Sequence, residues 1–351
     1  MNGKKFFLGA ISVSLSLMIL LALPTLYVDP FFHYRAPTEG VSYKLGNERY
    51  QNDGILRNCE YDAVIIGTSM SQNFKTSEAD ALFGVNSVKT PFAGGYFREM
   101  CDRLRAGYDS GHEIKQVILS LDLMSVLADK DAISAADYPE YLYDDNLLND
   151  IGYLFNKTVL VDYTLGNIRR TLAGRESDSY DAYSGWAHLD VFGRERVMSD
   201  YDRPAQVSEP APLTEDRLGE IRENIEQNVL SIAREHPETT FYCFIPPYSI
   251  AKIDSWYRLN AVDYYYGIME EVSRILLAEE NIRVFCFFED TELVCDLDSY
   301  RDIIHYSGSV NSHILECMAR GEHELSADTV GEYFDSLREI YGSFDFDAIF
   351  A

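Results

Sequence analysis

Two short segments far apart in the chain carry the residue types of a serine nucleophile and its base. An apolar run ends in Gly67-Thr68-Ser69, so a hydroxyl stands where a predicted strand gives way to the next element. Near the other end, Asp302 precedes His305 by three residues, which brings a carboxylate and an imidazole to the same side of one turn. In nucleophilic acyl chemistry a carboxylate orients a histidine and the histidine takes the hydroxyl proton. The sequence therefore predicts Ser69 as nucleophile, His305 as base and Asp302 as the group that orients the base.

Both motifs also have a simpler interpretation. Serine is favoured at helix starts because its side chain accepts a hydrogen bond from a backbone amide, so Ser69 could merely be a cap. The Asp-x-x-His spacing occurs again at Asp109 and His112, but that copy precedes a predicted strand and falls at the amino edge of the sheet. His305 follows the last predicted strand and can reach the carboxyl edge, where sites form. We assign surface or structural positions to the other histidines, which are His33, His188, His236, His313 and His323.

Donors for an oxyanion are expected at the same edge. The amide of Ser69, and that of Gly94 or Gly95 in the glycine turn after the second strand, could face a developing negative charge. Asn73, four residues after Ser69, could add a side-chain donor. The pocket rim is expected where the third and fourth strands end, at Asp122, Pro247 and Tyr248, although the last two could equally form a rigid strand-exit turn.

Short apolar runs alternate with longer amphipathic ones, which is typical of an α/β fold with a parallel sheet and helices on both faces. The predicted strands are Tyr61–Gly67, Asn86–Thr90, Gln116–Leu121, Thr239–Ile245 and Arg283–Phe288. The predicted helical segments are Ser77–Phe83, Phe97–Tyr108, Ile253–Glu280, Ser307–Arg320 and Ser326–Tyr341. About residues 127–215 this alternation lapses, and the many Tyr and Trp residues there favour a folded insertion whose rings could pack on the domain or stack on sugars.

The N-terminal residues predict a membrane anchor. Residues 6–28 contain no charged residue and as a helix would span about 34 Å, enough to cross a hydrocarbon core of roughly 30 Å. Lys4 and Lys5 before this run and an acidic body after it predict a cytoplasmic tail over residues 1–5 and an extracytoplasmic domain over residues 29–351. A cleaved signal peptide and a cytosolic enzyme that buries this helix are the alternatives.

Composition excludes some classes of function. The 351 residues include 30 Lys+Arg against 57 Asp+Glu, a net charge of −27, whereas nucleic-acid binding requires cations that neutralise phosphates. The six cysteines include no C-x-x-C pair and no Cys/His group with zinc spacing, so neither a metal site nor a cofactor is predicted. In an oxidising compartment, Cys59 could pair with Cys101 and Cys295 with Cys317. Cys243 and Cys286 lie in apolar runs and are expected to be buried thiols.

In combination, Gly67-Thr68-Ser69, the glycines at 94 and 95, and Asp302-x-x-His305 resemble the SGNH/GDSL hydrolase superfamily over roughly residues 50–320. With the N-terminal anchor, the pattern is similar to its extracytoplasmic branch, which includes the D-alanine transfer protein of teichoic acid synthesis and proteins of exopolysaccharide O-acetylation. The resemblance implies a flavodoxin-like three-layer fold. It also implies a serine esterase or O-acyltransferase that acts on a cell-surface glycan or polymer through acyl-Ser69.

One position departs from that family. An asparagine usually follows the third strand as a further oxyanion donor, and this chain has Asp122 there. A charged carboxylate would repel an oxyanion unless it is protonated or turned away, and the loss of one donor typically costs about 10²–10³ in rate. The alternative function is therefore a catalytically weak binding or assembly partner of a multi-span membrane O-acyltransferase. The acyl group, the acceptor and the choice between hydrolysis and transfer stay open.

Overall fold

The computed structural model describes residues 3–134, 138–144 and 146–350 and divides the chain into two compact units. The larger unit comprises residues 61–135 and 184–351, and the smaller comprises residues 1–60 and 136–183. The middle segment of the sequence is thus shared between them. Residues 136–183 fold with the N-terminal residues, whereas the chain from residue 184 onward belongs to the larger unit.

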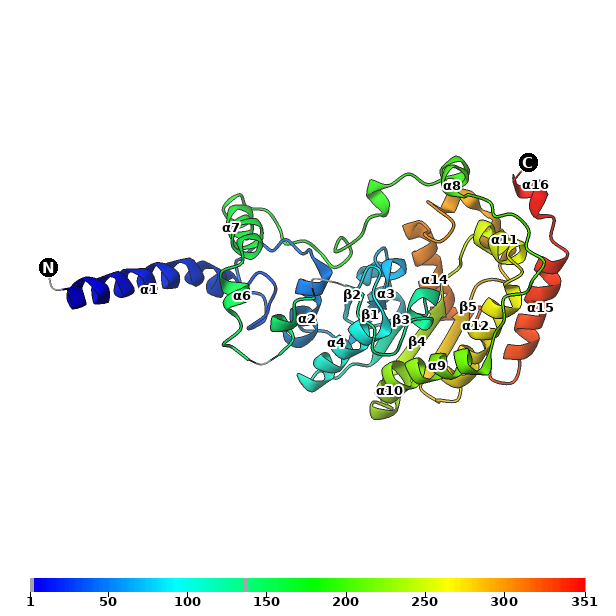
Figure 1. The fold of residues 1–351 in the computed structure, drawn as a ribbon, viewed down its shortest axis with the longest axis horizontal. Helices are drawn as coiled ribbons and strands as arrows, with labels where there is room; N and C mark the ends of the chain where they lie inside the picture. The colour runs from blue at the N-terminus through cyan, green and yellow to red at the C-terminus, as the bar shows by residue number, and fades with distance from the viewer. Residues whose placement is uncertain (1–2, 135–137, 145, 351) are drawn as a thin grey trace. The chain divides into compact units, whose positions relative to one another are not determined.

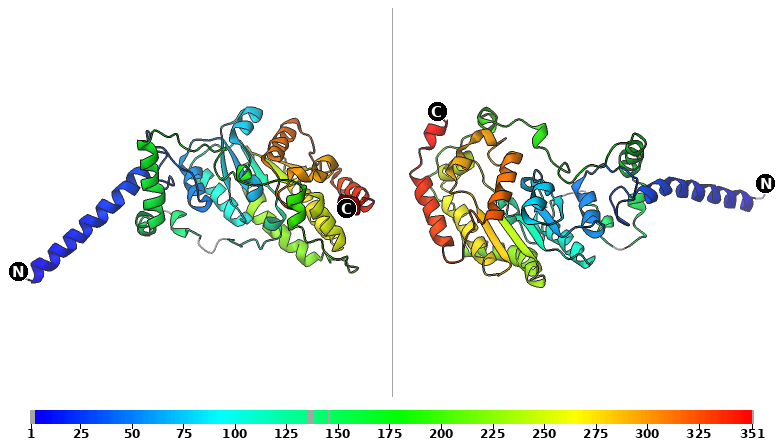
Figure 2. Two further views of the ribbon diagram at one scale, coloured as in Figure 1. Left: turned by 90° about the horizontal axis from the view of Figure 1, so that it is seen from above. Right: turned by 180° about the vertical axis from the view of Figure 1, so that it is seen from behind.

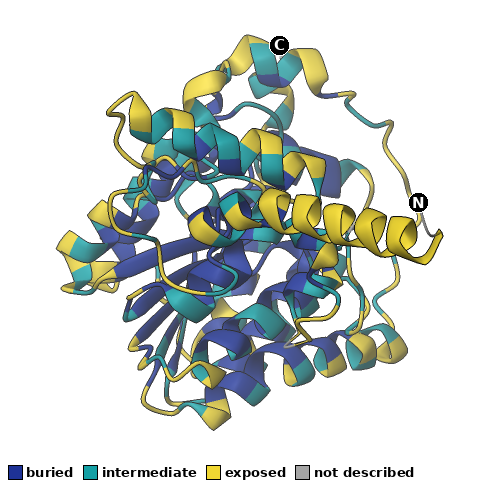
Figure 3. Ribbon diagram, turned by 90° about the vertical axis from the view of Figure 1, so that its left-hand side faces the viewer, coloured by how far each residue is buried: buried dark blue, intermediate teal, exposed yellow. Residues whose placement is uncertain are grey.

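The larger unit is built on a five-stranded parallel sheet with the order β2-β1-β3-β4-β5 (Figure 1). Its strands are β1 (Ala63–Gly67), β2 (Ser87–Pro91), β3 (Gln116–Ser120), β4 (Thr240–Ile245) and β5 (Ile282–Cys286). The strands are almost wholly buried because helices cover both faces, which explains their continuous apolar runs (Figure 3). The predicted α/β fold is confirmed, and each predicted strand overlaps an observed one.

Helices cover the two faces of this sheet in an order set by the connections. The chain runs from β1 to β2 at one edge of the sheet and then back through β3 and β4 to β5 at the other edge. Because such crossover connections are right-handed, α3, which joins β1 to β2, lies on one face, and the helices of the later connections lie on the opposite face. α3 packs with α14 on one face, and α4, η5, α9 and α12 pack together on the other, with α15 on α12 (Figure 2). The bounds are α3 (Thr76–Phe83), α4 (Phe97–Asp109), α9 (Glu215–Ile225), η5 (Glu226–Leu230), α12 (Val262–Leu276), α14 (Gly308–Arg320) and α15 (Val330–Gly342).

Shorter helices fill the connections of the larger unit. They are α5 (Leu123–Val126), α8 (Arg194–Asp200), α10 (Ser231–Glu235), α11 (Ile250–Arg258), α13 (Thr291–Cys295) and α16 (Phe346–Phe350). The strand order makes the carboxyl ends of β1 and β3 a switch point, because the chain leaves these neighbours toward opposite sides of the sheet. Ligands of open α/β sheets bind at such a point.

The smaller unit holds the N-terminal helix. It contains α1 (Gly3–Val28), α2 (Glu48–Asn58), α6 (Ile151–Leu154), the π-helical η3 (Thr158–Thr164) and α7 (Leu165–Leu172). Among the described residues, α1 alone is long and apolar enough to cross a membrane. Most of it is exposed (Figure 3), and so long an apolar surface requires apolar surroundings. The helix therefore has the properties of a membrane anchor or a signal sequence.

The end of α1 is fixed within the smaller unit by a buried carboxylate. Asp29, directly after the helix, accepts hydrogen bonds from the amides of His33 (3.0 Å) and Tyr34 (2.8 Å) and from the hydroxyl of Tyr153 (2.8 Å). Tyr153 belongs to the core of this unit, together with Phe31. The apolar helix is thus joined to a folded segment.

All six cysteines are free thiols, so the two disulfides considered from the sequence are wrong. Cys101 lies buried on α4, and Cys317 lies against His313 on α14 instead of a second sulfur. Cys243 and Cys286 are buried in β4 and β5, as expected from their apolar runs.

Candidate active site

The turn after β1 presents the hydroxyl of Ser69 at the carboxyl edge of the sheet. Gly67 permits the close packing of this turn, because a Cβ there would lie 2.2 Å from Ser71 Oγ and 2.6 Å from Ser120 Cβ. The next residues form a 3₁₀ turn, η1 (Ser69–Ser71), and its cap is Thr68, whose Oγ1 accepts a hydrogen bond from the amide of Met70 at 3.3 Å. Because Thr68 performs the capping, the hydroxyl of Ser69 is left for another partner.

That partner is His305, and a continuous hydrogen-bonded chain results. Ser69 Oγ lies 2.9 Å from His305 Nε2, and His305 Nδ1 lies 2.8 Å from Asp302 Oδ2. The other oxygen of Asp302 accepts hydrogen bonds from the amides of Ile304 and His305, both at 2.8 Å. The sequence motifs at the two ends of the larger unit are thus brought together with the spacing of a nucleophile, a base and an orienting carboxylate.

The environment of Asp302 keeps its carboxylate charged. Burial raises the pKa of Asp302, but the hydrogen bond and charge of His305 and the two backbone amides outweigh it, so the pKa lies below its ordinary value. An ionised Asp302 accepts a hydrogen bond from Nδ1–H of His305, which leaves Nε2 to take the proton of Ser69. Both side chains are about one quarter exposed, so a small molecule can reach them.

The second Asp-x-x-His copy lies at the opposite edge. Asp109 ends α4, and His112 stands in the connection before β3. The imidazole of His112 stacks on Tyr61, just before β1, with ring centroids 4.5 Å apart. The second Asp-x-x-His copy therefore lies at the amino edge of the sheet, whereas Ser69 follows the carboxyl end of β1.

Of the two glycines predicted as oxyanion donors, one has an amide that the fold already uses. The amide of Gly95 donates to the carbonyl of Phe92 at 2.7 Å. Gly94 has a φ of +62°, a conformation that favours glycine, and its amide makes no hydrogen bond within the part of the chain that the structure describes. Gly94 therefore stays the predicted second donor beside the amide of Ser69.

The carboxylate of Asp122 is held by donors of the protein itself. Its oxygens accept hydrogen bonds from Thr68 Oγ1 (2.9 Å), the amide of Met124 (3.0 Å) and the hydroxyl of Tyr248 (3.2 Å). Lys252 adds a nearby positive charge; burial lowers the pKa of this lysine and Asp122 partly raises it again. Asp122 thus braces the turn before Ser69, and these partners offset its charge.

Asn73 has a different role from the oxyanion donor that the sequence suggested. Its Oδ1 accepts hydrogen bonds from the amides of Trp186 (3.0 Å) and Ala187 (2.9 Å). The ring of Trp186 in turn stands edge-on to His305, with centroids 5.7 Å apart and planes at 87°. Asn73 therefore positions an aromatic wall beside the base.

This assignment can be tested with two substitutions of Asn73. We expect Asn73→Ala to lower kcat/KM for a model ester by up to about 100-fold, because small displacements at the base are costly. Asn73→Asp keeps an acceptor oxygen for the two amides and should restore most of the rate. If Asn73 acted as an oxyanion donor, Asn73→Asp would be at least as damaging as Asn73→Ala, and ester-hydrolysis kinetics distinguish the two outcomes.

Trp186 and Arg301 are members of this site that the sequence analysis missed. The guanidinium of Arg301 lies 5.4 Å from the centre of the Trp186 ring and forms an ion pair with Asp190 at 2.9 Å. The ring of Phe192 stacks with that of Trp186, with centroids 6.0 Å apart. The only available signals were the position of Arg301 beside Asp302 and the aromatic content of the middle segment.

Pro247 and Tyr248 are both buried, so the rigid strand-exit turn describes them and the pocket rim does not. Tyr248 is 2% exposed, and its ring packs against Trp256. The carbonyl of Pro247 accepts a hydrogen bond from the hydroxyl of Tyr300 at 2.9 Å. These contacts fix the loop that leads into Asp302.

Gly67 offers a test of the turn itself. We expect Gly67→Ala to destabilise the larger unit by about 1–3 kcal/mol, since its Cβ would overlap Ser71 and Ser120. Gly219→Ala is the matched control: Gly219 lies in α9 with no atom within 4 Å of an added Cβ, and alanine is the better helix former. Thermal unfolding of both variants should show a lower Tm for the first alone; an unchanged Tm for Gly67→Ala would contradict the close packing.

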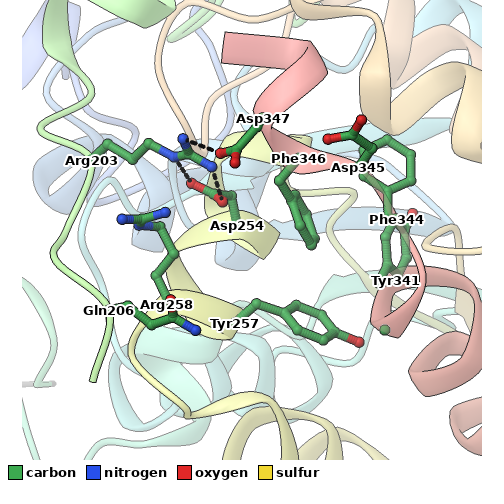
Figure 4. A pocket seen from close by; sticks show the side chains of 11 residues that line it. Arg203, Gln206, Asp254, Tyr257, Arg258, Tyr341, Phe344, Asp345, Phe346 and Asp347 are labelled. Atoms are coloured by element: carbon green, nitrogen blue, oxygen red, sulfur yellow. Dashed lines mark hydrogen bonds and ion pairs between the residues drawn. The ribbon is translucent and has the colours of Figure 1, made fainter. Parts of the chain in front are cut away.

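A separate cavity of about 290 Å³ in the larger unit contains none of the residues above (Figure 4). Arg203 lies in it and is paired with Asp254 at 2.8 Å and with Asp347 at 2.7 Å. The two carboxylates neutralise the guanidinium, so this cavity offers no unpaired charge from Arg203 to a ligand.

Comparisons with known proteins add little to this geometry. No protein-family model matches the chain, and the comparison with curated proteins gives no match. One solved structure, described as a "putative platelet activating factor from Streptococcus pneumonia", is 12% identical and covers 78% of this chain and 89% of its own, with a TM-score of 0.39. At that score the similarity supports no inference about function.

Proposed function

We propose that the larger unit is a serine esterase or O-acyltransferase of the SGNH type that works through acyl-Ser69. The observation that carries the proposal is the hydrogen-bonded chain from Ser69 through His305 to Asp302 at the carboxyl edge of β1. A hydroxyl, an imidazole and a carboxylate in this order form the machinery of acyl transfer.

The geometry supports a two-step reaction. Ser69 Oγ attacks the carbonyl carbon of an ester while its proton passes to His305 Nε2, and Asp302 stabilises the imidazolium. The oxyanion is stabilised by the amides of Ser69 and Gly94. His305 returns the proton to the alcohol as it departs, and the acyl group remains bound to Ser69. In the second step His305 deprotonates water or an acceptor hydroxyl, which takes the acyl group and regenerates the Ser69 hydroxyl.

The substrate class we propose is an acylated cell-surface glycan or polymer. Trp186, stacked with Phe192 and edge-on to His305, provides an aromatic surface next to the base that suits a sugar ring. The exposed apolar helix α1 supports a membrane tether. Lys4 and Lys5 before it favour an N-terminus inside and a catalytic unit outside. Such a tether would hold Ser69 near polymers assembled on the extracytoplasmic face of the membrane.

The tether has its own test. We expect the protein in the membrane fraction to keep its N-terminal residues, so that intact-mass measurement returns the full 351-residue chain. Carbonate washing should leave the protein in the membrane, and detergent should extract it. A mass that lacks the N-terminal segment would favour a cleaved signal sequence, and release by carbonate would favour a helix buried in a soluble enzyme.

The second candidate, an assembly partner of a multi-span membrane O-acyltransferase, was motivated by Asp122. The three hydrogen bonds that Asp122 accepts from Thr68, Met124 and Tyr248 weaken that motive, because the carboxylate is committed to the fold. The partner role therefore remains the alternative function, and a failed activity test would favour it.

The proposal is tested by labelling the full-length protein in detergent with a fluorophosphonate, which reacts with activated serines. We expect one label per chain, located on Ser69 by peptide mass spectrometry, and no label after heat denaturation. Incubation with model acyl esters should give an acyl adduct on the same peptide. A folded protein that takes up neither label nor acyl group would contradict the proposal and favour the assembly partner.

A further inference from the structure

We propose that His313, Cys317 and His323 form a binding site for one divalent cation of the Zn²⁺ class. The three side chains belong to the larger unit and lie outside the chain of Ser69, His305 and Asp302. One potential ligand atom from each residue lies within 4.8 Å of the others. The proposal does not depend on the acyl chemistry proposed above.

The secondary structure explains why these residues converge. His313 and Cys317 are four residues apart on α14, so they project from the same face of the helix. After the helix, the chain turns back and runs beside β5, where the carbonyl of His323 accepts a hydrogen bond from the amide of Cys286 at 3.0 Å. The helix ends at Gly321, a left-handed C-cap with a φ of +70°, and His323 two residues later has a left-handed φ of +59°.

The distances suit tetrahedral coordination after small side-chain adjustments. Ligand atoms around a tetrahedral zinc ion are separated by roughly 3.3–3.8 Å. Cys317 Sγ already lies 3.5 Å from His313 Nε2. One thiolate and two imidazoles form a donor set that favours zinc over the hard cations magnesium and calcium.

Two carboxylates lie beside the imidazoles. Asp290 Oδ2 lies 3.8 Å from His313 Nε2, while Asp290 Oδ1 is held by the amide of Leu293 at 3.0 Å. Asp290 is not among the residues whose ligand atoms all lie within 4.8 Å of one another, so a water molecule would supply the fourth ligand. Glu289 lies 3.1 Å from His323 Nδ1, which fixes that ring with Nε2 left for the cation, the usual support of a metal-binding histidine.

The surrounding charges favour a cation. Arg320 lies 3.8 Å from Cys317 Sγ, but it is paired with Glu322 at 2.8 Å and Glu316 at 3.5 Å. Cys317 must lose its thiol proton when a cation binds. A cation here would join α14 to the segment that follows it and runs beside β5.

The test uses the full-length protein in detergent, stripped with a chelator and titrated with Co²⁺ as a spectroscopic substitute for Zn²⁺. We expect one equivalent to bind, with a thiolate-to-cobalt charge-transfer band that Zn²⁺ abolishes by displacement. Zn²⁺ at about 100 times its Kd should also raise the Tm by about 5 °C.

Variants assign the ligands. Cys317→Ser should abolish the charge-transfer band, and His323→Asn should weaken Co²⁺ binding at least tenfold while it retains a residue that tolerates a positive φ. Cys295→Ser and His236→Gln, a cysteine and a histidine outside the cluster, are the matched controls and should bind like wild type. If Cys317→Ser fails to fold, His323→Asn still decides the question. Absence of the band in wild type, or an unchanged affinity in His323→Asn, would overturn the proposal.

Discussion

Replacement of Ser69 by alanine is expected to abolish fluorophosphonate labelling and to lower the rate of model-ester hydrolysis by about 10⁴–10⁶-fold. The reason is that the acyl-enzyme route needs the hydroxyl that lies 2.9 Å from His305 Nε2. The hydroxyl caps no helix, since Thr68 does so, and the substitution should therefore leave the Tm within a few degrees of wild type. Initial rates with a chromogenic ester and a thermal melt measure both quantities.

The control for this prediction is Ser309→Ala. Ser309 is exposed at the start of α14, and its hydroxyl contacts only that of Ser307 among the described residues, so the variant should label and hydrolyse like wild type. A combined Ser69→Ala and His305→Ala variant should be no slower than Ser69→Ala alone, because groups that act as one unit are not additive. Labelling that persists in Ser69→Ala would show that another serine is activated and would contradict the proposed role.

The second large effect is expected from Asp302→Asn, which should lower kcat by about 10⁴-fold. Asparagine fills the same volume but cannot hold His305 with Nδ1 protonated and Nε2 ready to accept a proton, so the base would be presented in the wrong tautomer. Asp109→Asn is the matched control, since it makes the same chemical change in the second Asp-x-x-His copy at the amino edge. Steady-state kinetics on both variants should show the loss for Asp302→Asn alone, and equal rates for the two would contradict the assignment.

Asp302→Asn should also change the response to acid. The pKa of Asp302 in the folded protein is lowered below its ordinary value of 3.8, so its contribution to stability is present above that value and is lost as the pH falls through the lower folded pKa. The Tm difference between wild type and Asp302→Asn should therefore be largest near neutral pH and should shrink below about pH 4. A difference that grows toward acid would have the wrong sign for this role.

The structure also gives physical limits on what local sequence patterns can reveal about the site. Asp122 looked like a charge placed against an oxyanion, whereas Thr68, Met124 and Tyr248 hold its carboxylate. Asn73 looked like a donor because of its spacing from Ser69, whereas its oxygen binds the amides of Trp186 and Ala187. In both cases most partners of the polar side chain come from segments that are distant in sequence, such as Tyr248 for Asp122 and Trp186 for Asn73.

The sequence by itself determined the sheet and the pairing of its chemical groups. Strands buried on both faces need continuous apolar runs, so each strand could be located from such a run in the sequence. Carboxyl ends of parallel strands meet at one edge, so the order of the elements was enough to choose His305 over His112 as the neighbour of Ser69. These conclusions depend on backbone direction and periodicity, which are local properties of the chain.

Only the tertiary structure decided the contacts made between segments. It divided the middle of the chain, placing residues 136–183 with the N-terminal residues and Trp186 beside His305. It also brought His323 back to His313 and Cys317, a group whose sequence spacing matches no familiar metal motif. Such contacts are set by how helices and loops pack on the sheet and by the turn that follows α14 at Gly321. Neither the period of apolar residues nor the spacing of a motif contains that information.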